Sequence, residues 1–301
     1  MSLLVTGSIG IDTVTTPYGV SKNCLGGSAI YFSFAASFFT PVRFAGVIGS
    51  DCPFDLEKFF EGRNVDLTGL ETRDQSKTFR WKGSYHGSMN EAITDDVQLN
   101  VLAEAPPAVP EIYKDSEFVF LANTAPELQM QLLDQIDSPT FVAADTMNCW
   151  IENKQDDLKK LLARIDCLIL NEDEARRLAR QTNLITVAKE ILKMGPSCVI
   201  IKKGQYGSLV VNKNDDIFQL PAYPAELVKD PTGAGDGFAG GLMGYLAKNN
   251  ACDFGTLKTA IAYGTVVASF AISDFSLNGL MEIKLQDIQE RFEKLKQLTI
   301  F

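Results

Sequence analysis

Short apolar runs alternate with helix-like stretches along most of the chain. The apolar runs are rich in β-branched and aromatic residues and are expected to form buried strands: 3–8, 42–49, 118–123, 140–145, 167–170, 198–203 and 208–211. Helical patterns follow several of them: 27–39, 53–61, 126–136, 152–164 and 172–180. Strands separated by helices imply right-handed crossovers. The pattern therefore predicts an α/β fold with a largely parallel sheet covered by helices on both faces.

Residues 77–102 break this rhythm, because they alternate with a period of two and carry no helical signature. Phe79, Trp81 and Tyr85 share one face of the predicted strand, and polar residues occupy the other. A small antiparallel lobe inserted into the α/β body fits this pattern, and a hairpin at the edge of the main sheet is the alternative. The chain shows no internal repeat and no Pro-rich linker, so residues 1–301 are expected to form a single domain that carries this lobe.

Composition and charge exclude several functions. The net charge is −10 and 46% of the residues are hydrophobic, so we expect a large core and no binding to nucleic acid or acidic membranes. No apolar run is long enough for a membrane span and no signal peptide is evident, so the expected location is the cytoplasm. The six cysteines show no metal-like spacing and are expected to be reduced. An anionic substrate would need a local positive potential from backbone amides, a few cations or a metal.

The stretch DPTGAGDGFAGG, residues 230–241, places glycines where an apolar run predicts a helix. Each glycine costs about 1 kcal/mol in a helix interior, so some other requirement must favour them. One explanation is that glycines let phosphate oxygens approach the backbone. The free N–H groups from Gly233 to Asp236 would then bind an anion, and Asp236 could accept the proton of an attacking hydroxyl. Alternatively, Asp236 only complements the helix dipole.

Two nucleotide-binding motifs do not explain this stretch. Residues 235–240 fit G-x-G-x-x-G, but no buried strand precedes them, so the match to a dinucleotide fingerprint is weak. The chain also contains no G-x-x-x-x-G-K-[ST] sequence, which excludes the ordinary P-loop. The helix start itself remains as the candidate anion site.

Here the chain resembles a known family, the ribokinase-like (PfkB) carbohydrate kinases. The stretch 230–241 is similar to the family's C-terminal signature, and the likeness extends along nearly the whole chain. The further matching motifs are GSIGID (7–12), LGGSA (25–29), Asn171-x-x-Glu174 and KKGQYG (202–207). The resemblance implies a three-layer, doubly wound α/β fold. Residues 77–102 occupy the place of the family's inserted β-lid, to which 12–22 would also contribute.

The resemblance also implies a role for each matching residue. Asp236 would be the catalytic base, and Gly233, Ala234 and Gly235 would form an anion hole. Substrate hydroxyls would meet Asp12, Gly26 and Gly27. The nucleotide would lie near Asn171, Lys202, Gly204 and Gly207, with Glu174 organising Mg²⁺ through water. Asp230 and Thr232 match part of a monovalent-cation site, for K⁺, although 268–280 lacks the family's glycine-rich loop.

Each of these residues also has a purely structural explanation. Asn171 and Glu174 have the spacing of a helix capping box. Asp12 could be a turn residue, and Gly26-Gly27 a tight connection between strand and helix. All of them nevertheless fall at strand ends, where open α/β sheets bind ligands. The predicted function is therefore an ATP- and Mg²⁺-dependent kinase acting on a hydroxyl of a sugar or sugar-like molecule.

Two alternatives remain at this stage. The first is a nucleoside kinase of the same family, in which Phe79, Trp81 and Tyr85 could stack on a base or could simply pack the lid. The second is a non-catalytic sugar or nucleotide sensor, which would have no need for Asp236. A lid with an aromatic face is poorly stable when uncovered, so we also predict a homodimer joined through the lid.

Overall fold

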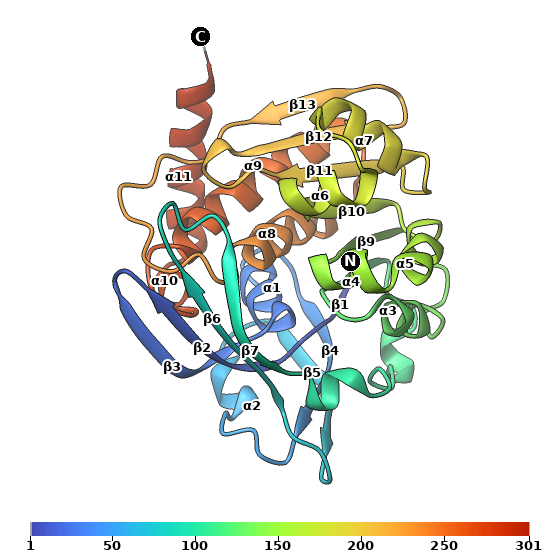
Figure 1. Cartoon of the computed structure of the whole chain (residues 1–301), viewed down its shortest axis with the longest axis vertical. Coiled ribbons are helices and arrows are strands. Elements are labelled where there is room, and N and C mark those ends of the chain that lie inside the picture. Colours follow the sequence, from blue (N-terminus) through green and yellow to red (C-terminus); the bar gives the residue numbers. More distant parts are fainter. Residues whose placement is uncertain (1, 301) are drawn as a thin grey trace.

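The computed structural model describes residues 2–300, and its main element is a nine-stranded sheet (Figure 1). In sheet order the strands are β13 (Ile217–Leu220), β12 (Ser208–Asn212), β11 (Cys198–Lys202), β10 (Cys167–Asn171), β9 (Phe141–Asp145), β8 (Phe118–Leu121), β1 (Leu3–Thr6), β4 (Val42–Gly49) and β5 (Val65–Arg73). Neighbouring strands are parallel from β11 to β5, and only β12 and β13 pair antiparallel. The predicted mostly parallel sheet is confirmed.

Helices cover both faces of this sheet, because the strands are apolar on both sides. One face packs against α1 (Ser28–Ala36), α2 (Leu56–Phe59), α8 (Ala234–Asn249), α9 (Phe254–Ala271), α10 (Asn278–Met281) and α11 (Leu285–Thr299). The other packs against α3 (Pro126–Leu133), α4 (Asn148–Asn153), α5 (Gln155–Leu162), α6 (Glu172–Ala179) and α7 (Leu184–Leu192). Along β1, Leu3 and Val5 join the first core and Leu4 joins the second. This is the predicted three-layer α/β architecture.

The strand order reverses at β1, which lies between β8 and β4. The chain builds the sheet outward from β1 in one direction through β4 and β5, and in the other through β8 to β11. In open α/β sheets the ligand crevice lies outside the carboxyl ends of the strands at such a reversal. Helix α8 contacts β1 and β8. The topology therefore indicates the region around the start of α8 as the place for a ligand.

A separate four-stranded sheet lies beside α1 and α8 (Figure 1). Its strands, in sheet order, are β3 (Gly19–Gly26), β2 (Gly10–Thr16), β6 (Phe79–Tyr85) and β7 (Ala92–Gln98). We call it the small sheet. It includes most of the segment 77–102 and also residues 10–26, so it is more than a hairpin at the edge of the main sheet.

The aromatic face of the small sheet is covered by the rest of the chain. Tyr85 and Met89 are buried with Val14, and Val228 packs against them from the segment before α8. The Tyr85 hydroxyl lies 3.3 Å from the Thr232 hydroxyl. The rest of the chain thus buries Tyr85 and leaves Phe79 and Trp81 half-buried. The covered part of this face does not need a second copy, and the homodimer stays a prediction.

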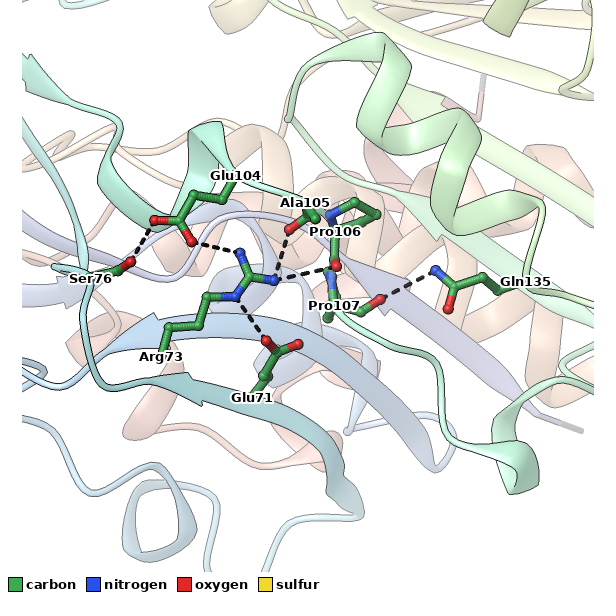
Figure 2. Close-up of polar contacts among 8 residues, drawn as sticks. All are labelled: Glu71, Arg73, Ser76, Glu104, Ala105, Pro106, Pro107 and Gln135. Atoms are coloured by element: carbon green, nitrogen blue, oxygen red, sulfur yellow. Dashed lines mark hydrogen bonds and ion pairs between the residues drawn. The ribbon is translucent and has the colours of Figure 1, made fainter.

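An arginine-centred network fixes the segment that leads from the small sheet back to β8 (Figure 2). The guanidinium of Arg73, at the end of β5, donates to Glu71 and Glu104 and to the carbonyls of Ala105 and Pro106. From α3's side, Gln135 donates to the Pro107 carbonyl. Ser76 donates to Glu104 at 2.5 Å. The return segment is thus tied to the large sheet and to the region after α3.

Several elements differ from the sequence-based expectation. The stretch 53–61 contains only the four-residue α2, and 152–164 is divided between α4 and α5. The pattern analysis did not identify β5, β13, α7, α9, α10 or α11. Three short 3₁₀ turns complete the described chain: η1 (Asn100–Ala103), η2 (Glu111–Tyr113) and η3 (Gly204–Tyr206). Within residues 2–300, every helix is too short or too polar to cross a membrane.

Candidate active site

The site centres on the first turn of α8, which contains Asp236. Gly233 caps this helix with φ of 74°, a left-handed conformation that favours glycine. A Cβ at this position would also lie 2.3 Å from the ring of Tyr31. Backbone angle and close packing therefore both require glycine at position 233.

Three of the four amides expected to be open are open. Within the described chain, the N–H groups of Gly233, Gly235 and Asp236 have no hydrogen-bond acceptor. The N–H of Ala234 instead donates to the Pro231 carbonyl at 3.1 Å, so the expectation that Ala234 offers a free amide is wrong. The remaining amides still form a helix N-terminus suited to an anion.

The glycines inside α8 serve helix packing rather than phosphate approach. A Cβ on Gly240 would lie 2.4 Å from the Phe32 carbonyl of α1, and one on Gly244 would lie 3.0 Å from the Ala36 carbonyl. A Cβ on Gly241 would lie 3.1 Å from the Cα of Gly264 in α9. The conformational cost of these residues is offset by the close contact of three helices. The phosphate explanation applies only to the helix start.

Protein atoms around the Asp236 carboxyl raise its pKa to about 6. Desolvation is the main cause, Glu174 adds to it, and the ammonium of Lys202 opposes it. The residue nevertheless keeps part of its surface exposed. A partly accessible carboxyl that is ionised near neutral pH has the properties of a general base.

Asp145 is a site residue that the sequence analysis missed. It is the last residue of β9, it is 6% exposed, and its Oδ1 has no hydrogen-bond partner within the described chain. Burial raises the pKa of its carboxyl well above the ordinary value, and the charge of Asp236 adds to this. The signal was its place at the end of an apolar strand, the same signal that singled out Asn171.

Asn171 and Glu174 form a complete capping box at the start of α6. The Glu174 amide donates to Asn171 Oδ1 at 2.8 Å, and the Asn171 amide donates to Glu174 Oε2 at 2.8 Å. Glu174 is 8% exposed, and burial raises the pKa of its carboxyl while Lys202 lowers it. The structural explanation is therefore correct. The capping box uses only Glu174 Oε2, and Oε1 accepts no hydrogen bond within the described chain. Glu174 could therefore also bind a ligand.

Asp12 lies within β2 of the small sheet rather than after the first strand of the large one. It is 4% exposed, and its Oδ1 has no partner within the described chain. Desolvation, followed by the charges of Asp230 and Asp236, raises the pKa of its carboxyl to about 7. The structure thus brings Asp12 and Asp236 together from opposite ends of the sequence.

The Gly26-Gly27 pair makes room for Asp12 and for a tight chain reversal. A Cβ on Gly26 would lie 1.9 Å from an oxygen of the Asp12 carboxylate, so any larger residue there would force that carboxylate to move. Gly27 has φ of 98° and packs against the Ser8 carbonyl. Both glycines are therefore required by the local structure that holds Asp12.

Asp230 and Thr232 have internal partners. Asp230 is fully buried, and its two oxygens accept from the amides of Thr232, at 2.9 Å, and Ser276, at 3.2 Å. This carboxylate joins the start of α8 to the loop after α9. The contacts supply a structural role without any cation at this position.

The predicted nucleotide residues in and after β11 lie in different surroundings. Asn90, from the turn between β6 and β7, lies 2.8 Å from where a Cβ on Gly204 would be. Gly207 has φ of 83° and packs against the Leu220 carbonyl, so the β12–β13 hairpin requires glycine there. Only Lys202, the last residue of β11, reaches the start of α8.

The geometry also limits how a metal could be held. Among the described residues, no group of three or more His, Cys, Asp or Glu side chains is arranged to hold a metal ion. Mg²⁺ usually takes one or two carboxylates, several waters and substrate phosphates. Asp145 and Glu174, with unpartnered or partly used oxygens, fit that kind of site.

Comparison with known proteins gives matches over most of the chain. The sequence model of the pfkB family carbohydrate kinases matches residues 25–284. A cytidine kinase of Thermococcus kodakarensis is 29% identical over 253 residues, which cover 81% of this chain and 88% of the relative.

Solved structures show the same fold. A Cryptococcus neoformans ribokinase in complex with ADP superposes with a TM-score of 0.79 at 19% identity, covering 96% of this chain and 99% of that one. A Burkholderia thailandensis nucleoside kinase in complex with inosine gives a TM-score of 0.77 at 18% identity, with 97% of each chain covered.

The buried carboxyl of Asp12 predicts a pH-dependent stability. Its folded pKa of about 7 exceeds the ordinary 3.8, so folding carries no ionisation cost below about pH 4 and the full cost above about pH 7. We expect Asp12→Asn to raise the free energy of unfolding at pH 8 by about 1–3 kcal/mol. Urea unfolding at pH 5 and pH 8 measures this, and the gain should shrink at pH 5. The exposed Asp74→Asn is the control; an equal gain at both pH values would contradict the prediction.

Proposed function

The chain belongs to the PfkB family of carbohydrate kinases and is a phosphotransferase with a hydroxyl acceptor; we propose that it uses ATP and that Asp236 is its general base. One observation carries this proposal. Asp236 combines a partly open position, a pKa of about 6 and a helix N-terminus with open amides. Phosphoryl transfer depends mainly on positioning and charge stabilisation, and these features supply both.

In the proposed reaction, Asp236 accepts the proton of the acceptor hydroxyl. The resulting oxygen nucleophile forms the new bond to the γ-phosphorus of ATP, and the bond between that phosphorus and the bridging oxygen of ADP breaks. The open amides of Gly233 and Gly235 face the phosphoryl oxygens at the start of α8, where the helix dipole also favours negative charge. The chain is acidic overall, so this local positive potential matters for binding an anion.

We propose that Asp145 and Glu174 hold Mg²⁺, in part through water. When bound, Mg²⁺ would neutralise negative charge on the phosphates. Both carboxyl groups have pKa values raised by burial, so a nearby dication would favour their ionised forms. Asn171 keeps Glu174 in place through the capping box.

For Asp230 and Thr232, the internal partners favour a structural role over K⁺ binding.

The acceptor would lie between Asp236 and the small sheet, with Asp12 accepting hydrogen bonds from its hydroxyls. A specific observation favours a nucleoside over a simple sugar. In the parallel pair of β2 and β6, Trp81 is in register with Asp12, and Val97 of β7 is opposite Trp81. An indole and an aliphatic side chain therefore lie beside Asp12, where a base could stack. The Thermococcus kodakarensis relative, which is a cytidine kinase, agrees with this preference.

The base assignment predicts a large kinetic effect. Asp236→Asn keeps the size of the side chain but removes proton acceptance, so we expect kcat to fall about 10²–10⁴-fold. ATP affinity should be unchanged or tighter, because the amides remain and one negative charge near the phosphates is lost. Coupled ADP detection over pentoses, hexoses and nucleosides, with calorimetry for ATP, provides the measurement.

The wild-type profile and a stability control complete that experiment. The acid limb of kcat/KM should fall below about pH 6, the pKa of Asp236. If Asp236 served only the helix dipole, its amide would unfold slightly more easily, by about 0.3–1 kcal/mol, and would turn over normally. A parent-like kcat would therefore exclude the mechanism.

The magnesium proposal has its own test. Glu174→Gln retains an oxygen for the Asn171 amide, so the capping box and the fold should survive, whereas the charge is lost. We expect the Mg²⁺ concentration for half-maximal activity to rise several-fold and kcat to fall. Glu172→Gln, in the same helical turn and paired with Arg176, is the matched control. If both variants titrate with Mg²⁺ like the parent, Glu174 only caps the helix.

A homodimer remains a prediction, on a different basis from the one first given. Tyr18, Val20, Ile93 and Leu99 are exposed hydrophobic residues within or next to the small sheet. Clustered exposed apolar residues often mark an interface. Light scattering at tens of micromolar should give about twice the monomer mass, and Val20→Lys combined with Ile93→Lys should restore the monomer. A monomeric parent would exclude a stable dimer.

A further inference from the structure

Lys202 occupies an unusual position at the start of α8. It is the last residue of β11, and its strand neighbour in register is Asn171. Its Nζ lies 2.7 Å from the point that a Cβ on Gly235 would occupy. The ammonium group therefore lies beside Gly235, whose amide has no acceptor within the described chain, in space that exists because residue 235 is glycine.

This ammonium group has no partner that explains its place. Among residues 2–300, no carboxylate oxygen lies within the 4.0 Å that defines an ion pair with Lys202. Three carboxyl groups nevertheless surround it at longer range, Asp145, Glu174 and Asp236, and it lowers the pKa of each. A cation placed beside amides and short of any carboxylate is arranged for an anion that comes between them.

We propose that Lys202 is a catalytic residue whose ammonium group contacts the transferring phosphoryl group together with the amides of Gly235 and Asp236. This inference rests on the proposed kinase function and goes beyond nucleotide binding, because it assigns the contact to the group that moves. As the bond to the ADP oxygen breaks and the bond to the acceptor oxygen forms, negative charge is shared among the three other phosphoryl oxygens. The ammonium group of Lys202 neutralises part of that charge, while Asp236 takes the hydroxyl proton.

The same position gives Lys202 a second effect, on the base itself. Asp236 meets two opposing influences besides burial: Glu174 disfavours its charge and Lys202 favours it. Asp12, on β2, is a further acidic neighbour of Asp236. Without the ammonium group, Asp236 would face Glu174 and Asp145 in a desolvated site and would bind its proton more tightly. Lys202 thus lowers the pKa of the base, in opposition to burial and to Glu174.

The main test replaces Lys202 with Met, and with Gln as a second variant in case one folds poorly. Removing a charged donor that acts in the transition state typically costs about 10²–10³-fold in rate, so kcat should fall by about that factor. The Kd for ADP without Mg²⁺, measured by calorimetry, should change less than about threefold. Lys203→Met removes the same charge one residue further along and should leave both values near those of the parent. A parent-like kcat, or a loss of ADP affinity that accounts for the loss of activity, would overturn the proposal.

A second arm needs no turnover. Carbon-13 titration of the Asp236 carboxyl in the ligand-free protein, assigned with Asp236→Asn, should give a higher pKa in Lys202→Met than in the parent. The acid limb of the kcat/KM profile should move to higher pH in the same variant. An unchanged Asp236 pKa would refute the electrostatic part of the inference. If the parent phosphorylates no acceptor in the panel, the kinase proposal fails, and this titration still decides whether the two side chains are coupled.

Discussion

Three buried or half-buried carboxyl groups share one ammonium group at the N-terminus of α8, and the candidate site depends on this arrangement. Burial raises the pKa of Asp145, Glu174 and Asp236 and so favours their protonated forms. Lys202 opposes that tendency without forming an ion pair, so it remains available to an incoming anion. A direct salt bridge would have stabilised the carboxylate but would have removed both the base and the cation from the reaction.

The rest of the fold holds these groups in one place. Asp145, Asn171 and Lys202 end three adjacent parallel strands, β9, β10 and β11, so the sheet itself sets their spacing. Helix α8 brings Asp236 to the same edge, and its glycines allow α1 and α9 to approach closely enough to fix the helix. A site built on strand ends and a tightly packed helix start can hold its geometry within the limits that catalysis requires.

The small sheet supplies the opposite wall. It carries Asp12 and Trp81 in register, and it is joined to the body through Tyr85, Thr232, Met89 and Val228. Its turn reaches as far as Gly204 on the nucleotide side. Acceptor recognition and the start of α8 are therefore mechanically connected, and the Arg73 network anchors the segment that leaves this sheet. A shift of the small sheet would therefore alter both the acceptor side and the nucleotide side of the site.

The sequence by itself determined the α/β class, the positions of most strands along the chain, the position of the inserted β segment and the unusual glycine content of the helix start at 230–241. These features are local: apolar runs, period-two alternation and glycine clusters are visible without knowing the contacts. The capping box at Asn171 and Glu174 was also readable, because its hydrogen bonds span only three residues.

The tertiary structure determined which residues distant in sequence contact one another. The glycines of α8 could not be assigned to helix packing until α1 and α9 were in place, and the Ala234 amide is used by a turn that no spacing rule predicts. Asp12 meets Asp236 although 223 intervening residues separate them in the chain. Asp145 became a site residue for the same reason, and Lys202, which was expected near the nucleotide, was placed beside the start of α8. Burial and charge at a strand end depend on which strands lie next to it, and parallel pairing between distant segments is a property of the folded chain alone.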